Sequence, residues 1–225
     1  LTYSFYPVWC SLFGIKYKTY PVDDNFRINP EDYKEQNGGV VIPNPNAPTS
    51  LGEGLDFVEK ILDYNDDSVV IIDEAYVDFG GTSSVSLVEK YENLLVTGTF
   101  SKSRSLAGLR IGFAIGSKTL IDVMEAVKNS YNSYTVDSLS IEMGTASIED
   151  KEYFEETCKK VIKTRARVTD ELRLLGFDVL DSQTNFVFAT HNEHNMKSLF
   201  EYLKTQKVFI RYFSLPRIEN YVRIT

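Results

Sequence analysis

Short apolar runs alternate with amphipathic stretches through the first half of the chain. The apolar runs are GVVIP (39–43), SVVIIDEAY (68–76) and NLLVTGTF (93–100), and amphipathic stretches at 51–64 and 83–91 separate them. Runs that are apolar at nearly every position are typical of parallel strands covered by helices on both faces. The alternation predicts an α/β domain with its ligand site at the carboxyl ends of the strands.

The pattern changes in the second half of the chain. A further strand is predicted at 110–116, a helix at 117–131, and one long charged helix at about 149–175 that ends at Gly176. Short strands then follow at 176–180, 184–189, 207–213 and 220–225, around a helix at about 195–205. The pattern predicts a large domain over 1–148 and a smaller α+β domain over 149–225.

The charge balance narrows the function classes. The 225 residues hold 24 Lys and Arg against 32 Asp and Glu, a net charge of −8, which argues against nonspecific nucleic-acid binding. No apolar run approaches the roughly 20 residues that cross a bilayer, so no membrane association is expected. Cys10 and Cys158 lie far apart and are expected to be reduced core thiols, which favours a cytoplasmic location. His191 and His194 are expected in a solvated turn, and no metal site is predicted.

Polar residues follow each of the first three predicted strands. They are Asn44 and Asn46, then Asp73 and Tyr76, then Thr99, Ser101 and Lys102. The segment 97–112 combines hydroxyls with Lys102, Arg104 and Arg110, a set that suits a phosphate-bearing ligand. Asp73 follows four apolar residues and must find a partner, because an unpaired buried charge is costly. A solvated surface loop, a helix cap and a metal ligand are the alternatives for these groups.

Three segments, taken in order, are more specific than any one alone. NPNAPTS (44–50), DEAYVDF (73–79) and SKSRSLAGLRIGFAIG (101–116) together resemble the fold type I aminotransferases that use pyridoxal phosphate, and most closely the histidinol-phosphate aminotransferase family. The resemblance runs from TYSFY (2–6) to YVRIT (221–225). It implies an α/β, aspartate-aminotransferase-like fold: a mostly parallel sheet flanked by helices, and part of a smaller α+β domain.

The resemblance implies the catalytic residues. Lys102 matches the lysine that forms the internal aldimine and then moves the proton between the substrate's Cα and the cofactor's C4′. Asp73 matches the carboxylate that pairs with the pyridine nitrogen, which keeps the ring an electron sink. Tyr76 matches the tyrosine that hydrogen-bonds the cofactor's phenolic oxygen.

The same resemblance implies further cofactor contacts. Thr99, Ser101 and Arg110 match the ligands of the cofactor phosphate. Tyr3 matches the aromatic residue that stacks on the pyridine ring, although a core tyrosine is the alternative.

The chain departs from the family pattern after the first strand. Ala47 stands where the wider family has an asparagine that bonds the phenolic oxygen, and Ser50 replaces a glycine. That bond is therefore assigned to Asn46. For the substrate, Arg223 matches the arginine that grips a carboxylate or phosphate. Arg211 is a second candidate, with a surface charge as its alternative, and Asn185 resembles an asparagine near the substrate.

The activity implied by the resemblance is transfer of the amino group of histidinol phosphate to 2-oxoglutarate, within histidine biosynthesis. An aromatic amino acid aminotransferase, a threonine-phosphate decarboxylase and a noncatalytic folded fragment are the alternatives. Family members are homodimers, and exposed aromatic residues in LTYSFYPVW would suit an interface. Because family members extend beyond both ends of this sequence, we expect a truncated chain without the glycine-rich turn and the intersubunit arm.

Overall fold

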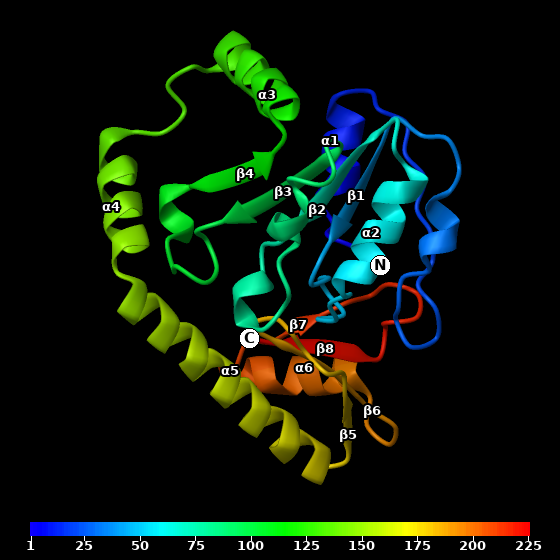
Figure 1. Cartoon of the computed structure of the whole chain (residues 1–225). Helices are drawn as coiled ribbons and strands as arrows, with labels where there is room; N and C mark the ends of the chain where they lie inside the picture. Colours follow the sequence, from blue (N-terminus) through cyan, green and yellow to red (C-terminus); the bar gives the residue numbers. More distant parts are fainter.

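Two four-stranded sheets organise the chain in a computed structural model that describes residues 1–225 (Figure 1). The first sheet has the order β1-β2-β3-β4, formed by Gly39–Pro43, Val69–Asp73, Leu94–Thr99 and Gly112–Gly116. Strands β1, β2 and β3 are parallel, and β4 runs antiparallel to β3. The sheet is therefore mostly parallel, which confirms the predicted α/β class.

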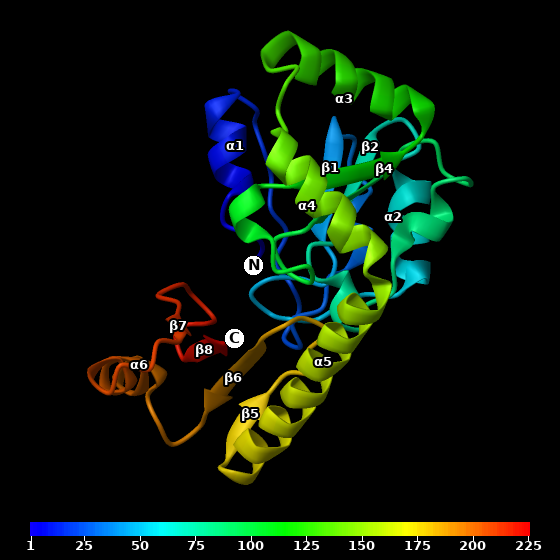
Figure 2. The same ribbon diagram turned by 90° about the vertical axis from the view of Figure 1, so that its left-hand side faces the viewer.

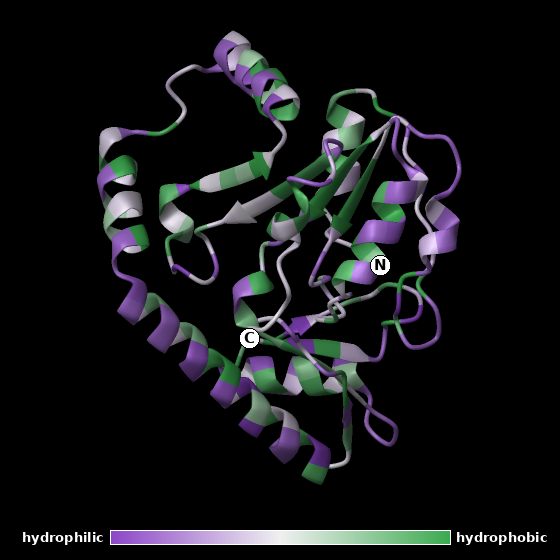
Figure 3. Ribbon diagram, in the orientation of Figure 1, coloured by the Kyte–Doolittle hydropathy of each residue, from purple (hydrophilic) through white to green (hydrophobic).

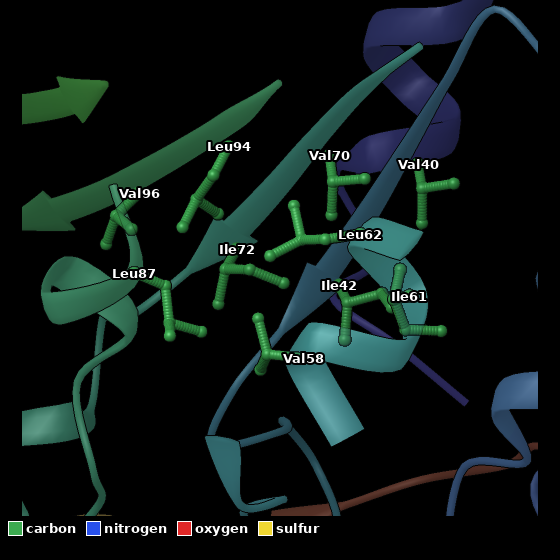
Figure 4. Packing of buried hydrophobic residues seen from close by; sticks show 10 residues of the cluster. All are labelled: Val40, Ile42, Val58, Ile61, Leu62, Val70, Ile72, Leu87, Leu94 and Val96. Atoms are coloured by element: carbon green, nitrogen blue, oxygen red, sulfur yellow. The ribbon is translucent and has the colours of Figure 1, made fainter. Parts of the chain in front are cut away.

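The main core lies between this sheet and helix α2 (Leu55–Tyr64). Valine, leucine and isoleucine side chains from the strands interdigitate with those from the helix, each contributing about 1.5–3 kcal/mol when fully buried (Figure 4). The ten buried members are Val40, Ile42, Val58, Ile61, Leu62, Val70, Ile72, Leu87, Leu94 and Val96. This packing holds the three parallel strands in register, so each residue at a strand end keeps the same neighbours on the adjacent strands.

The opposite face of the sheet is less covered than the apolar runs predict. Along β2, buried positions alternate with half-buried ones, and Val41 of β1 and Ile115 of β4 are exposed. The stretch 83–91, which the pattern marks as amphipathic, forms only a short 3₁₀ turn at Ser84–Leu87. Its first backbone N–H is bonded to the Glu74 carboxylate, and Leu87 alone enters the core.

Short elements connect and flank the first sheet. The N-terminal helix α1 (Tyr6–Leu12) lies beside it, and α3 (Lys118–Tyr131) and α4 (Ser138–Glu149) follow β4 around its far edge (Figures 1 and 2). Three further 3₁₀ turns are found at Pro30–Tyr33, Val77–Phe79 and Ala107–Leu109. Ser117 accepts the Leu120 N–H and so begins α3 where the sequence predicts.

The second sheet has the order β5-β6-β8-β7 and is antiparallel throughout. Its strands are Phe177–Val179, Val187–His191, Tyr221–Ile224 and Arg211–Tyr212, and helix α6 (Met196–Thr205) lies before β7. The long helix α5 (Lys151–Leu174) borders this sheet and is largely hydrophilic along its length (Figure 3). Gly176, two residues after the end of α5, has a φ of +87°, the left-handed conformation that glycine adopts most easily after a helix.

The N-terminal segment also packs against the second sheet. Val22, Phe26 and Leu51 form one buried cluster with Phe188 and Ile218. Residues from before position 148 therefore take part in the packing of the C-terminal part, and the division at 148/149 stays a prediction.

His191 differs from the sequence-based expectation of a solvated turn. It lies in β6, it is buried, and its Nδ1 accepts the Glu193 N–H at 3.0 Å. That bond leaves Nε2 to carry the proton toward the Leu175 carbonyl oxygen at 3.3 Å. The prediction for His191 is wrong because its strand pairs on both sides, with β5 and β8.

Cys158 is buried and Cys10 half-buried, both with free thiols. No helix combines the length and the apolar character needed to span a membrane.

Arg165 of α5 joins elements that belong to the two sheets. Its Nη1 donates to the carbonyl oxygen of Phe79, six residues after β2, at 2.7 Å, and to that of Thr184, just before β6, at 2.5 Å. Burial lowers the pKa of this guanidinium from its usual value. A single cation therefore satisfies two backbone acceptors from distant parts of the chain.

We expect Arg165→Ala to lower the free energy of unfolding by about 2 kcal/mol, since it leaves two carbonyls without a charged donor. The measurement is urea denaturation. Arg167→Ala is the matched control, because Arg167 lies on the same helix in an exposed pair with Glu171, and such pairs contribute little. Equal losses in the two variants would contradict the linking role of Arg165.

Candidate active site

The carboxyl ends of the three parallel strands bring the predicted polar residues together. In the sheet register, Asp73 of β2 lies between Pro43 of β1 and Thr97 of β3. The loop after β1 begins on the same residue, because the Asn44 N–H donates to the Asp73 carbonyl oxygen at 2.9 Å. The segments that carry Asn46, Tyr76 and Lys102 therefore start from one edge of one sheet, where parallel sheets place their ligands.

Asp73 holds its carboxylate in place through two donors. Its Oδ1 accepts the Ala75 N–H at 3.1 Å, and its Oδ2 accepts the Tyr6 hydroxyl at 2.7 Å. The side chain is half-buried and forms no salt bridge. The second donor comes from α1, a contact between segments 67 residues apart that the sequence does not indicate.

Lys102 lies in the loop after β3 and has a free, exposed ammonium group. Its Nζ lies 5.4 Å from the centre of the Tyr76 ring and forms no salt bridge. The loop is held on both sides of Lys102, because Ser103 Oγ donates to Asp78 at 2.5 Å and the Ser101 N–H donates to Thr99 Oγ1 at 3.0 Å. The structure thus brings Lys102 and Tyr76 together, as predicted.

Arg104 does not belong to the basic pocket that the segment 97–112 suggests. Its guanidinium donates to the Ser147 carbonyl oxygen and lies over the Phe154 ring at 4.1 Å. The prediction is wrong for this residue because α4 and α5 offer a carbonyl and an aromatic face that are invisible in the local sequence.

Thr99 and Ser101 lie together, whereas Arg110 is turned toward its own loop. Arg110 has a left-handed φ of +56°, is exposed, and donates to the Ala107 carbonyl oxygen at 2.8 Å. No hydrogen bond joins its side chain to Thr99 or Ser101. Thr99 Oγ1 therefore accepts the Ser101 N–H and donates to the Ile111 carbonyl oxygen, and Arg110 keeps its remaining donors free.

Asn46 is buried, and its amide makes other hydrogen bonds than the predicted one to the cofactor's phenolic oxygen. Its Nδ2 donates to Thr49 Oγ1 at 2.9 Å and to the Leu1 carbonyl oxygen at 3.3 Å, which uses both N–H bonds. The atom without a partner is Oδ1, an acceptor. In this arrangement Asn46 offers an acceptor rather than the donor that a phenolic oxygen requires.

Tyr3 is 43% exposed, which rules out the alternative of a core tyrosine. Its ring meets that of Tyr6 edge-on, with centroids 5.4 Å apart, and Tyr6 in turn bonds Asp73. Tyr3 thus lies two contacts away from the carboxylate at the end of β2.

The predicted substrate-binding residues gather on the second sheet. Arg211 of β7 lies directly opposite Arg223 of β8, and neither forms a salt bridge. Arg223 Nε is buried without a hydrogen-bond partner. Asn185, in the loop before β6, is half-buried and its side chain makes no hydrogen bond.

Phe186 connects this sheet with the lysine site, and sequence reasoning missed it. The Arg223 guanidinium lies 4.9 Å from the centre of the Phe186 ring. The same ring meets Tyr76 edge-on at 5.3 Å. Lys102, Tyr76, Phe186 and Arg223 therefore form an unbroken series of contacts from the first sheet to the second. Position 186 follows Asn185 directly, but an apolar residue in a predicted strand carries no signal of such a role.

Comparison with known proteins places the chain in a family. It matches the family of class I and II aminotransferases over residues 1–225. The histidinol-phosphate aminotransferase of Acinetobacter baumannii strain AYE is 54% identical over 225 residues, which cover the whole of this chain and 62% of that protein. Histidinol-phosphate aminotransferase 2 of Dechloromonas aromatica strain RCB is 51% identical over 226 residues, which cover 64% of its length. The chain thus spans less than two-thirds of these curated relatives.

Solved structures agree on the fold. The histidinol-phosphate aminotransferase of Clostridium acetobutylicum superposes with a TM-score of 0.89 at 25% identity, covering 99% of this chain and 70% of that one. The Sinorhizobium meliloti enzyme, solved in complex with pyridoxal 5′-phosphate, superposes with a TM-score of 0.86 at 21% identity, covering all of this chain and 63% of that one. With the family matched along its whole length, the chain belongs to the class I and II aminotransferases.

Proposed function

We propose that the protein is a pyridoxal-phosphate-dependent aminotransferase that transfers the amino group of histidinol phosphate to 2-oxoglutarate, in histidine biosynthesis. The names of the relatives above 50% identity support histidinol phosphate as the amino donor. The single observation that carries the chemistry is the placement of Lys102 beside Tyr76, with Asp73 at the end of the neighbouring strand.

The donor set at the strand ends fits pyridoxal phosphate. Lys102 offers a free amine for the cofactor's aldehyde, Asp73 a carboxylate for the pyridine nitrogen, and Tyr76 a hydroxyl for the phenolic oxygen. Thr99, Ser101 and Arg110 would hold the phosphate, and Tyr3 would cover the ring. The bound cofactor supplies an electron sink for the charge that develops at the substrate's Cα.

Three residues of the chain have separate roles in the proposed reaction. Two bonds hold the loop on either side of Lys102, and its amine would take the proton from the substrate's Cα and return it in the second half of the transfer. Asp73 would hold the pyridine nitrogen of the cofactor and keep a proton on it. Phe186 packs its buried ring between Tyr76 and the Arg223 guanidinium, and so sets the separation between the lysine and the arginine.

The paired arginines favour an anionic substrate. Like charges directly opposite one another on a sheet are destabilising unless an anion lies between them. Arg223 also keeps a buried, unpartnered Nε, which a phosphate or carboxylate oxygen would satisfy. The arrangement therefore supports a substrate that carries a phosphate.

We also infer a cytoplasmic homodimer. Phe5 and Trp9 are each 46% exposed and stand with Tyr3 in one aromatic cluster at the start of the chain. Exposed aromatic clusters of this kind are enriched at protein interfaces. The oligomeric state and location stay predictions.

The direct test is covalent trapping of the cofactor. The chain is incubated with pyridoxal phosphate and reduced with borohydride, and its peptides are weighed by mass spectrometry. We expect the added mass on the peptide that contains Lys102, and a loss of the visible absorbance in Lys102→Ala. Lys118→Ala, which changes an exposed lysine paired with Asp122, should behave as wild type. Labelling that persists unchanged in Lys102→Ala would remove the lysine from this role.

A substrate panel tests the second half of the proposal. We expect Arg223→Gln to raise KM for histidinol phosphate by about 10- to 100-fold, the range for one lost charge-assisted contact, with a smaller change for unphosphorylated histidinol. Steady-state kinetics with both donors measure the difference. Conversion of phenylalanine but not histidinol phosphate by the wild type would favour an aromatic aminotransferase, and carbon dioxide release from threonine phosphate a decarboxylase.

A further inference from the structure

Tyr6 makes the most specific contact to the proposed active site that the family motifs do not explain. Its hydroxyl donates to Asp73 Oδ2 at 2.7 Å, and it is the sole side chain that donates to this carboxylate. The bond joins α1 to the end of β2, two segments that share no sheet and no strand pairing.

Packing aims the Tyr6 hydroxyl at Asp73. Tyr6 is the first residue of α1, with Pro7 directly after it, and its backbone N–H donates to the Tyr3 carbonyl oxygen at 3.3 Å. The rings of Tyr3 and Trp9 lie 5.4 and 6.0 Å from the Tyr6 ring. The ring is half-buried with these two aromatic neighbours beside it, and its hydroxyl reaches the strand end.

Tyr6 is suited to remain a donor. Burial, and after it the charge of Asp73, raise the pKa of the Tyr6 hydroxyl above its ordinary value. For a tyrosine this means that the neutral, proton-bearing form is held over the whole pH range in which enzymes of this kind work. The hydroxyl therefore keeps the proton that it donates to Asp73.

The carboxylate of an aspartate needs more than one contact to keep its plane, because rotation about χ2 is broad and nearly two-fold. The Ala75 N–H holds Oδ1, and the Tyr6 hydroxyl holds Oδ2. We propose that Tyr6 is a positioning residue that fixes the plane of the Asp73 carboxylate for the pyridine nitrogen of the cofactor. This role rests on the proposed function, since it needs a cofactor with a ring nitrogen at Asp73.

The role has a kinetic signature. Tyr6 touches Asp73 and not the arginines of the second sheet, so it acts on cofactor orientation and leaves the substrate anion unaffected. Its loss should lower kcat and weaken cofactor binding while KM for the amino donor stays within about twofold. A residue that merely stabilised the fold would change the amount of active protein and leave the cofactor affinity unchanged.

The experiment compares Tyr6→Phe with Tyr64→Phe in the 225-residue chain. Tyr64 is a matched control, because its hydroxyl donates to the Glu31 carboxylate at 2.6 Å on an exposed surface. Pyridoxal phosphate is titrated into each protein and its dissociation constant is measured by fluorescence quenching. We expect the constant to rise about tenfold in Tyr6→Phe, equivalent to ~1.4 kcal/mol, and to stay unchanged in Tyr64→Phe.

The outcomes separate the two proposals. If wild type and Tyr64→Phe bind the cofactor and Tyr6→Phe binds it equally well or more tightly, the positioning role is overturned and the proposed function stands. Tighter binding would mean that Tyr6 competes with the pyridine nitrogen for Asp73. If the wild type binds no cofactor, the proposed function fails, and the positioning role fails with it.

A measurement on the wild type covers the case in which Tyr6→Phe does not fold. In protein labelled with ¹³C at the tyrosine ζ carbon, the Tyr6 resonance is assigned through its contacts with the Trp9 ring. We expect its hydrogen-bonded shift to persist when pyridoxal phosphate is added. A shift to the value of a solvated tyrosine on cofactor addition would overturn the positioning role.

Discussion

Parallel pairing of β1, β2 and β3 is the constraint on which the rest of the structure depends. The register sets Pro43, Asp73 and Thr97 side by side, and the core beneath these strands is packed by α2 on one face. Every predicted cofactor residue except Tyr3 and Arg110 lies at the end of one of these strands or within a few residues after it. A slip of one residue in β2 would turn Asp73 to the other face of the sheet, and the donor set would no longer converge.

A second set of contacts ties outlying segments to that edge. Tyr6 brings α1 to Asp73, and Arg165 brings α5 and the loop before β6 to the 3₁₀ turn after β2. The Tyr76–Phe186–Arg223 series then continues into the antiparallel sheet. These contacts are few, but each joins groups with a preferred geometry. They therefore set the distances between the segments that they join. The separation between the lysine and the arginines thus depends on residues that touch neither a cofactor nor a substrate.

The net charge does not show how unevenly the basic groups are distributed. The chain carries a net charge of −8, yet Lys102, Arg211 and Arg223 all lack carboxylate partners. Four basic side chains on the helices, Lys118, Lys159, Lys160 and Arg167, instead pair with an acid four positions away. Basic groups left unpaired beside one another at the strand ends and on β7 and β8 mark where anions are expected.

Local sequence determined most of the strands and helices and most of the chemical types at the site, although it missed α1 and α4. The apolar runs at 39–43, 68–73 and 94–99 and the capping residue Ser117 act over a few residues, so their strands and helix follow from propensity and spacing. Asp73, Tyr76 and Lys102 could be identified from the family motifs, because each motif is a short segment at or just after the end of a predicted strand. Only the tertiary structure decided the partners of those residues. The Tyr6 bond to Asp73, the capture of Arg104 by α4 and α5, the burial of His191 and the place of Phe186 between two sheets all join segments distant in sequence. Such contacts depend on how the packed layers meet, and a pattern of neighbouring residues carries no information about that.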